Sequence, residues 1–189
     1  MAHIRLICLM SLLLLITSNA GGDSLSSLNP KAGIGVMAGL AYDPGDARDF
    51  IGVNAFFLFD YDKIWGHDAP NCLKFKTELS IGSSLATENL IVSSGIEALL
   101  YLDKFETKIF RPYVEAGIGI VYTDYKVNGQ GLRLNFNPRA GIGTDIKVKG
   151  RLPMFCCLRL WHLSNANLHS ENRGSNAVVL LIGQYFNLP

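Results

Sequence analysis

The most informative stretch is Leu73-Lys74-Phe75-Lys76-Thr77-Glu78-Leu79-Ser80-Ile81, in which mostly apolar side chains alternate with charged or polar ones. Successive residues of a strand point to opposite faces, so this period of two predicts a strand with one apolar and one polar face. The same period recurs along the chain. We expect eight antiparallel strands, over residues 31–42, 49–60, 72–83, 89–102, 109–123, 131–147, 152–165 and 176–187.

The length of these strands indicates the class of fold. Several exceed the roughly 5–6 residues of an ordinary soluble strand and reach the ~9–11 that cross a bilayer obliquely. Lipid cannot satisfy unpaired backbone groups, so a sheet in a membrane must close on itself. The sequence therefore predicts an all-β fold, an eight-stranded antiparallel transmembrane β-barrel of the outer-membrane type. A soluble β-sandwich or lipocalin-like barrel is the alternative, but water would penalise its apolar outward face.

Composition supports one globular domain and excludes two classes of protein. The chain has 189 residues, of which 49% are hydrophobic and 17% charged. This apolar content excludes a disordered chain. The 17 basic and 16 acidic residues nearly cancel, so we expect no nucleic-acid partner held by bulk charge.

The N-terminus has the features of a secretory signal peptide. A short basic start precedes an apolar run from Leu6 to Ile16, and the small residues Ser18 and Ala20 follow. We expect cleavage after Ala20, which leaves residues 21–189 as a single barrel domain in the outer membrane of a Gram-negative bacterium.

An eight-stranded barrel is wide enough only for side chains, so we expect its interior to be filled rather than to form a porin channel. The inward charged residues would form a plug of ion pairs, made by Lys74, Lys76, Glu78, Glu97, Arg111, Glu115, Arg133, Arg139 and Arg159. Pro112 and Pro138 fall inside predicted strands and are expected to mark bulges. Aromatic residues at strand ends are expected to form a girdle at the membrane surfaces, namely Tyr42, Phe59, Tyr122, Tyr185 and Phe186.

The cysteine and histidine residues do not indicate a disulfide framework or a metal site. Three cysteines follow the signal peptide, and two of them are adjacent; we interpret Cys72, Cys156 and Cys157 as small apolar fillers. The histidines lack the spacing of a zinc site. We expect no metal and no cofactor.

One pair of residues suggests chemistry. His162 and Ser164 lie two apart on a predicted strand, hence on one face with Cα atoms roughly 6.5–7 Å apart. An imidazole can reach a serine hydroxyl at that distance, which is the pairing of a base with a nucleophile. Parity puts Leu158 and Leu160 on the same face, so the pair should face the membrane. If both termini are periplasmic, Ser164 and the 166–175 loop lie at the outer leaflet.

The segment around this pair resembles a known family. His162-Leu163-Ser164-Asn165-Ala166 is followed by Glu171-Asn172-Arg173-Gly174-Ser175-Asn176 and by a strand ending Gly183-Gln184-Tyr185-Phe186. Over residues 157–186 this is similar to the PagL-type lipid A 3-O-deacylases, which read His-x-Ser-Asn-Ala, a loop with Asn-x-Gly, and a final strand closing on an aromatic residue. Members are outer-membrane esterases with a Ser-His-Glu triad on the lipid-facing wall.

The resemblance implies a role for several residues of this chain. Ser164 would be the nucleophile, His162 the general base, and Asn165 and Asn172 would support the site or the oxyanion. This chain has Asn176 where the resemblance expects the triad glutamate; either the Asn176 carbonyl or Glu171 from the loop would then be the third member. Asn167 stands where the family usually has glycine.

Two functions remain as hypotheses at this point. One is a serine–histidine esterase that removes the 3-position acyl chain of lipid A in lipopolysaccharide, with outer-membrane lipid around it. The other is a non-catalytic OmpX-like barrel with a structural or adhesive role, because fold alone does not define function. The sequence leaves open the acyl-chain selectivity and whether the barrel forms a homodimer.

Overall fold

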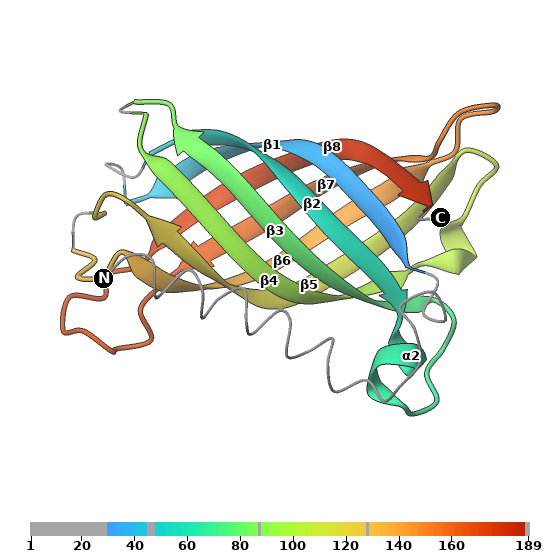
Figure 1. Cartoon of the computed structure of the whole chain (residues 1–189), viewed down its shortest axis with the longest axis horizontal. Coiled ribbons are helices and arrows are strands. Elements are labelled where there is room, and N and C mark those ends of the chain that lie inside the picture. The colour runs from blue at the N-terminus through green and yellow to red at the C-terminus, as the bar shows by residue number, and fades with distance from the viewer. Residues whose placement is uncertain (1–29, 45–47, 87, 128, 188–189) are drawn as a thin grey trace.

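The computed structural model describes residues 30–44, 48–86, 88–127 and 129–187. The signal peptide predicted at residues 1–20 lies outside them. Eight antiparallel strands form a closed barrel, in which each strand pairs with its neighbours in sequence and the first pairs with the last (Figure 1). The strands are β1 (Lys31–Asp43), β2 (Phe50–Asp60), β3 (Leu73–Ser84), β4 (Leu90–Tyr101), β5 (Phe110–Thr123), β6 (Leu134–Ile146), β7 (Met154–Leu163) and β8 (Ser175–Asn187). The predicted fold class is confirmed.

The two ends of the barrel differ. Lys31 pairs with Asn187, so β1 begins where β8 ends; we call this the terminal end. It also carries the short helix α2 (Tyr61–Trp65), at the lower right of Figure 1, and the 3-10 turn η2 (Asp103–Phe105). The opposite, distal end carries the connections after β1, β3, β5 and β7. Among the described residues, no helix is long and apolar enough to span a membrane.

The outer wall of the barrel is apolar. Large aliphatic side chains stand exposed on it, for example Val36 at 61%, Leu40 at 63% and Ile142 at 64%. A soluble domain rarely exposes apolar surface of this extent, whereas a bilayer solvates it at no cost. The apolar face of the predicted strands therefore lies outside, as expected, and the charged residues of β3 such as Lys76 and Glu78 lie inside.

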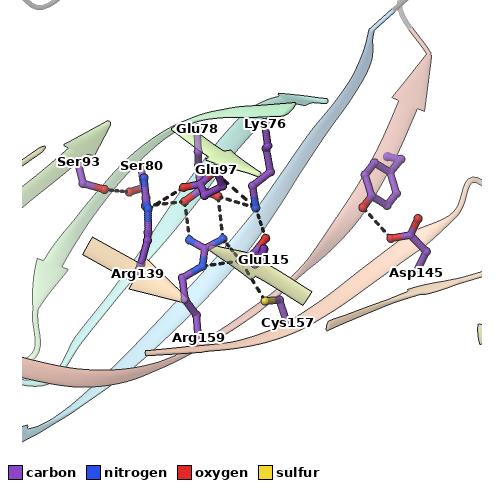
Figure 2. A network of polar contacts seen from close by, with 11 residues as sticks. Lys76, Glu78, Ser80, Ser93, Glu97, Glu115, Arg139, Asp145, Cys157 and Arg159 are labelled. Atoms are coloured by element: carbon purple, nitrogen blue, oxygen red, sulfur yellow. Dashed lines mark hydrogen bonds and ion pairs between the residues drawn. The ribbon is translucent and has the colours of Figure 1, made fainter. Parts of the chain in front are cut away.

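The interior holds an ionic cluster, which we call the plug (Figure 2), together with buried aromatic and aliphatic side chains such as Phe56, Leu99 and Trp161. Arg159 bridges Glu78 at 2.8 Å and Glu115 at 2.7 Å, and Arg139 contacts Glu97 at 2.6 Å. Cys157 adds an Sγ contact to Glu115 at 3.3 Å, so this thiol lies beside the plug. The members of the plug are three carboxylates and three cations, Glu78, Glu97, Glu115, Lys76, Arg139 and Arg159.

The predicted plug was too large. Lys74 pairs with Asp60 and Arg111 with Asp103, both at the terminal end, and Arg133 is exposed in the loop before β6. Lys74 and Arg111 do have the predicted inward parity, opposite the buried Leu99 and Asp145, but they lie at strand ends, where side chains can reach water instead of joining the plug. The strand expected from residue 131 begins only at Leu134.

Two further expectations about strand residues are wrong. Pro112 and Pro138 pair in unbroken register with Thr144 and Ile118, so neither marks a bulge. Tyr185, expected in an outer aromatic girdle, is buried inside, where its hydroxyl donates to Asp145 at 2.7 Å. Its position in β8 has inward parity, and the Asp145 carboxylate inside the barrel gives the phenol a buried acceptor.

Candidate active site

Two of the predicted site residues, His162 and Asn176, lie in one row across neighbouring strands at the distal end, and Ser164 lies two residues beyond His162, just past the end of β7. His162 of β7 pairs directly with Asn176 of β8, and Asn176 pairs with Asp43 of β1. On the other side, Ser164 forms an isolated bridge with Phe136 of β6. Directly paired residues of an antiparallel ladder project to the same face. His162 is exposed and follows Leu160, itself 55% exposed, so this row lies on the outer wall of the barrel, as the sequence predicted.

A chain of hydrogen bonds runs along the row. His162 Nδ1 lies 2.7 Å from Asn176 Oδ1. The other end of the same amide, Asn176 Nδ2, donates to Asp43 Oδ2 at 3.0 Å. Of the two candidates for the third member, the structure therefore places Asn176 at the imidazole. Glu171 is exposed in the loop, and its backbone carbonyl accepts from Asn165 Nδ2 at 2.8 Å.

Sequence reasoning missed Asp43, because the predicted strand ended one residue earlier. The pairing of β1 with β8 runs regularly to Ala41 opposite Ala177, then shifts so that Asp43, and not Tyr42, lies opposite Asn176. This is a β-bulge, which reverses the facing of the residues beyond it and commonly re-aims a side chain near a site. The bulge is a shift in the pairing of β1 with β8, which are far apart in the sequence, so the residues around Asp43 do not by themselves indicate it.

Gly174 makes room for the histidine ring. Its backbone φ is +78°, and a Cβ built there would lie 3.0 Å from His162 Cε1 and 3.5 Å from Nε2. Its N–H donates to the side-chain oxygen of the buried Gln130 at 3.1 Å. Glycine is thus required both for the left-handed conformation and for the close approach of the imidazole.

A proline and an asparagine shape the backbone behind His162. Phe136 and Ser164 exchange both backbone hydrogen bonds, so the next such pair of the ladder would join Pro138 to His162. Pro138 has no N–H to give. Instead the side chain of Asn137, fully buried, donates to the His162 carbonyl at 3.0 Å. Asn137 is a second site residue that sequence reasoning missed, since its function depends on the partner strand.

The loop after β7 is held by its own asparagines. The Asn165 N–H donates to Asn172 Oδ1 at 2.8 Å, and Asn172 Nδ2 donates to Asn167 Oδ1 at 2.9 Å. Ala166 and Asn167 both have positive φ, 51° and 62°. Asparagine is among the residues that best tolerate this conformation after glycine, so Asn167 can provide the backbone that the family obtains with glycine.

The loop between β5 and β6 braces this loop from the side. Gln130 and Asn172 form an isolated bridge, the Gly131 N–H donates to the Glu171 carbonyl at 2.9 Å, and the Arg173 N–H donates to the Gly129 carbonyl at 3.0 Å. The early part of the strand predicted from residue 131 is used for this contact. The two loops therefore form one braced unit next to Ser164.

The cavities found inside the barrel are small. One, of about 10 Å³, lies in the plug, and one of about 40 Å³ lies at the distal end behind the site, against Trp161 and Tyr125. Burial raises the pKa of the Tyr125 phenol, although the Arg48 guanidinium over its ring opposes this. These volumes hold at most a few water molecules, not an acyl chain. Among the described residues, no group of histidine, cysteine or carboxylate side chains is placed to hold a metal ion.

Comparison with known proteins identifies the family of this chain. The family model described as lipid A 3-O-deacylase (PagL) matches residues 65–184, which is more than half of the chain and includes β7, the loop after it and most of β8. The chain belongs to the PagL family. The resemblance stated from residues 157–186 is therefore confirmed. No curated protein sequence matches the chain significantly.

Solved structures share the fold of this PagL-family chain. The outer membrane enzyme PagL is 21% identical, with a TM-score of 0.60 over 80% of this chain and 98% of that one. Neisserial surface protein A (NspA) is 12% identical, with a TM-score of 0.59 over 84% and 97%. The N-terminal barrel domain of Pseudomonas aeruginosa OprF is 16% identical, with a TM-score of 0.50 over 82% and 97%. At these identities the structures bear on the barrel alone.

Proposed function

We propose that this protein is an outer-membrane esterase that hydrolyses the 3-position acyl ester of lipid A, with Ser164 as nucleophile and His162 as general base. Membership of the PagL family supports the substrate class. The observation that carries the proposal is the outward row in which the His162 imidazole is hydrogen-bonded to Asn176, on the strand that leads to Ser164.

The hydrogen bond to Asn176 suits His162 to act as a base. An amide oxygen only accepts, so Nδ1 carries the proton and Nε2 keeps its lone pair. Nε2 takes the Ser164 proton as Oγ attacks the ester carbonyl. The ester C–O bond then breaks, and the imidazolium returns the proton to the departing sugar oxygen. A water, activated in the same way, hydrolyses the acyl-enzyme and regenerates Ser164.

The proposed substrate reaches the site from the membrane. The imidazole projects from the outer wall, next to exposed leucines such as Leu160, and the interior cavities are too small for an acyl chain. With both termini in the periplasm, the distal end lies at the outer leaflet, where acyl chains of lipopolysaccharide meet its sugars. An ester at that depth can react without leaving the bilayer.

We assign supporting roles to the loop asparagines. Asn165 is buried, and its backbone N–H and side-chain amide both donate within the loop, so it holds the loop in shape. One N–H of the Asn172 amide is used by Asn167; the second is the donor that we assign to the oxyanion of the tetrahedral intermediate.

The test is hydrolysis of purified lipopolysaccharide by the full chain in detergent or lipid, followed by mass spectrometry of lipid A. We expect the native protein to remove one hydroxyacyl chain, and Ser164→Ala and His162→Asn to remove none. Ser170→Ala, an exposed serine in the same loop, is the matched control and should retain activity. Identical spectra for all four proteins would reject the esterase and leave a non-catalytic barrel.

A further inference from the structure

We propose that Asp43 is a positioning residue of this site, which acts through Asn176 to keep His162 in the tautomer that can accept a proton from Ser164. The inference rests on the proposed function, since it concerns the same imidazole. It identifies where the carboxylate of the site lies in a chain that has asparagine at position 176.

The bulge in β1 makes the contact possible. In the regular part of β1 the even-numbered residues face outward, as the exposed Val36 and Leu40 show. Without the shift after Ala41, the outward Tyr42 would lie opposite Asn176 and Asp43 would face the lumen. With the shift, Asp43 is exposed and its Oδ2 accepts from Asn176 Nδ2 at 3.0 Å.

The two ends of an asparagine amide are chemically different, and this is why the carboxylate matters. The amide could present either its oxygen or its NH₂ group to the imidazole, and shape alone barely distinguishes the two. An ionised carboxylate only accepts hydrogen bonds. Asp43 therefore attracts the NH₂ group, which leaves Oδ1 facing His162 Nδ1 at 2.7 Å.

The orientation of the amide in turn decides which imidazole nitrogen is basic. With Oδ1 toward the ring, Nδ1 must be the donor, and Nε2 is free to take a proton. If the amide were reversed, its NH₂ group would donate to Nδ1, the ring proton would reside on Nε2, and His162 could not act as a base toward Ser164. Asn176 alone permits both arrangements, whereas Asn176 with Asp43 permits one.

The kinetic test is a double-mutant cycle between positions 43 and 176. Asp43→Asn should lower kcat severalfold with little change in KM, because the amide at 176 can then present either end and only one of the two tautomers of His162 supplies the base. In the Asn176→Glu background the same change should cost less than about twofold, because a carboxylate at 176 has no donor end to misplace. Asp68→Asn, an exposed aspartate beyond α2 at the terminal end, removes the same charge and should leave kcat unchanged.

A spectroscopic measurement makes the inference independent of activity. In protein labelled with ¹⁵N-histidine, the Nδ1 and Nε2 shifts of His162 report its tautomer. We expect Nδ1–H in the native protein, and a shift toward Nε2–H in Asp43→Asn but not in Asp68→Asn. An unchanged tautomer in Asp43→Asn, or equal losses of kcat in both backgrounds at position 176, would overturn the inference. If the tautomer shifts but the native protein hydrolyses no lipid A, the inference stands and the proposed function fails.

Discussion

The plug and the outer row use polar side chains in opposite ways. Inside, Arg159 and its partners are buried, with side-chain exposures of about 1%, and cations and carboxylates balance. Outside, His162, Asn176 and Asp43 form a single line of hydrogen bonds that contains one carboxylate. Buried charges require partners, so the plug is specified by neutralisation. In the outer row, the arrangement depends on which atom donates each hydrogen bond, and His162 and Asp43 are exposed on the wall of the barrel. We expect changes in the plug to alter stability and changes in the row to alter rate.

The largest effect on stability is expected for Arg159→Met. This change removes a cation that Glu78 and Glu115 share and leaves the plug with three carboxylates and two cations, which costs about 3–5 kcal/mol of unfolding free energy. This free energy is measured by urea unfolding in lipid vesicles, with the folded fraction read from the heat-modifiable migration of the barrel on gels. His162→Asn on the outer wall should change the same quantity by no more than about 0.5 kcal/mol.

A second variant shows whether charge balance is the reason for this loss. Adding Glu78→Gln to Arg159→Met leaves two carboxylates and two cations in the plug and should recover part of the lost free energy. No recovery would mean that Arg159 stabilises the barrel by packing and not by neutralising the plug.

The lipid-facing wall provides the next largest effect. Leu158, 49% exposed near the middle of β7, should tolerate apolar replacement, whereas Leu158→Arg should cost about 2–4 kcal/mol because a charge is placed in hydrocarbon. The same vesicle assay measures it, with Leu158→Ile as the control. If Leu158→Arg left the unfolding free energy unchanged, this face would not contact lipid, and the alternative of a soluble barrel would be favoured.

An intermediate effect, on both stability and kcat, is expected for Asn137, a buried residue whose side chain contacts the backbone of the outer row. Asn137→Leu leaves the His162 carbonyl without its donor, at a cost of about 1–3 kcal/mol. Because that carbonyl belongs to the proposed base, kcat should fall as well. Urea unfolding and the removal of the acyl chain from lipid A are measured on the same preparation. Loss of stability with unchanged kcat would contradict a role for Asn137 in positioning His162.

The smallest effect is expected in the loop after Ser164. Asn167 has φ +62°, a conformation that costs alanine roughly 1–2 kcal/mol and glycine little. Asn167→Ala should therefore lower both loop stability and kcat. Asn167→Gly should retain the backbone and lose only the contact to Asn172. Hydrogen exchange of the loop amides measures the stability of the loop, and removal of the acyl chain from lipid A measures kcat. Equal behaviour of the two variants would argue that the left-handed backbone is unimportant.

Much of the barrel was predictable because the pattern that encodes it is local. The alternation of Lys76, Glu78 and Ser80 with apolar neighbours gave the facing of β3, and the outward facing of His162 followed from the same parity. The errors arose where a partner strand or a strand end intervened. Parity could not show that Arg133 belongs to a loop. Nor could it show that the hydrogen bond which Pro138 cannot donate to His162 is replaced by one from the Asn137 side chain, with no bulge in the strand.

The sequence by itself determined the period of two, hence the strands, their apolar outer face and the position of His162 and Ser164 two residues apart where one strand ends. Each of these depends on residues within a few positions of one another. The tertiary structure alone decided that Asp43 is aimed at Asn176, because that contact joins the first strand to the last and depends on a one-residue shift between them. Closure of the barrel brings these distant segments together, and the hydrogen-bond register between them selects which side chain faces the site.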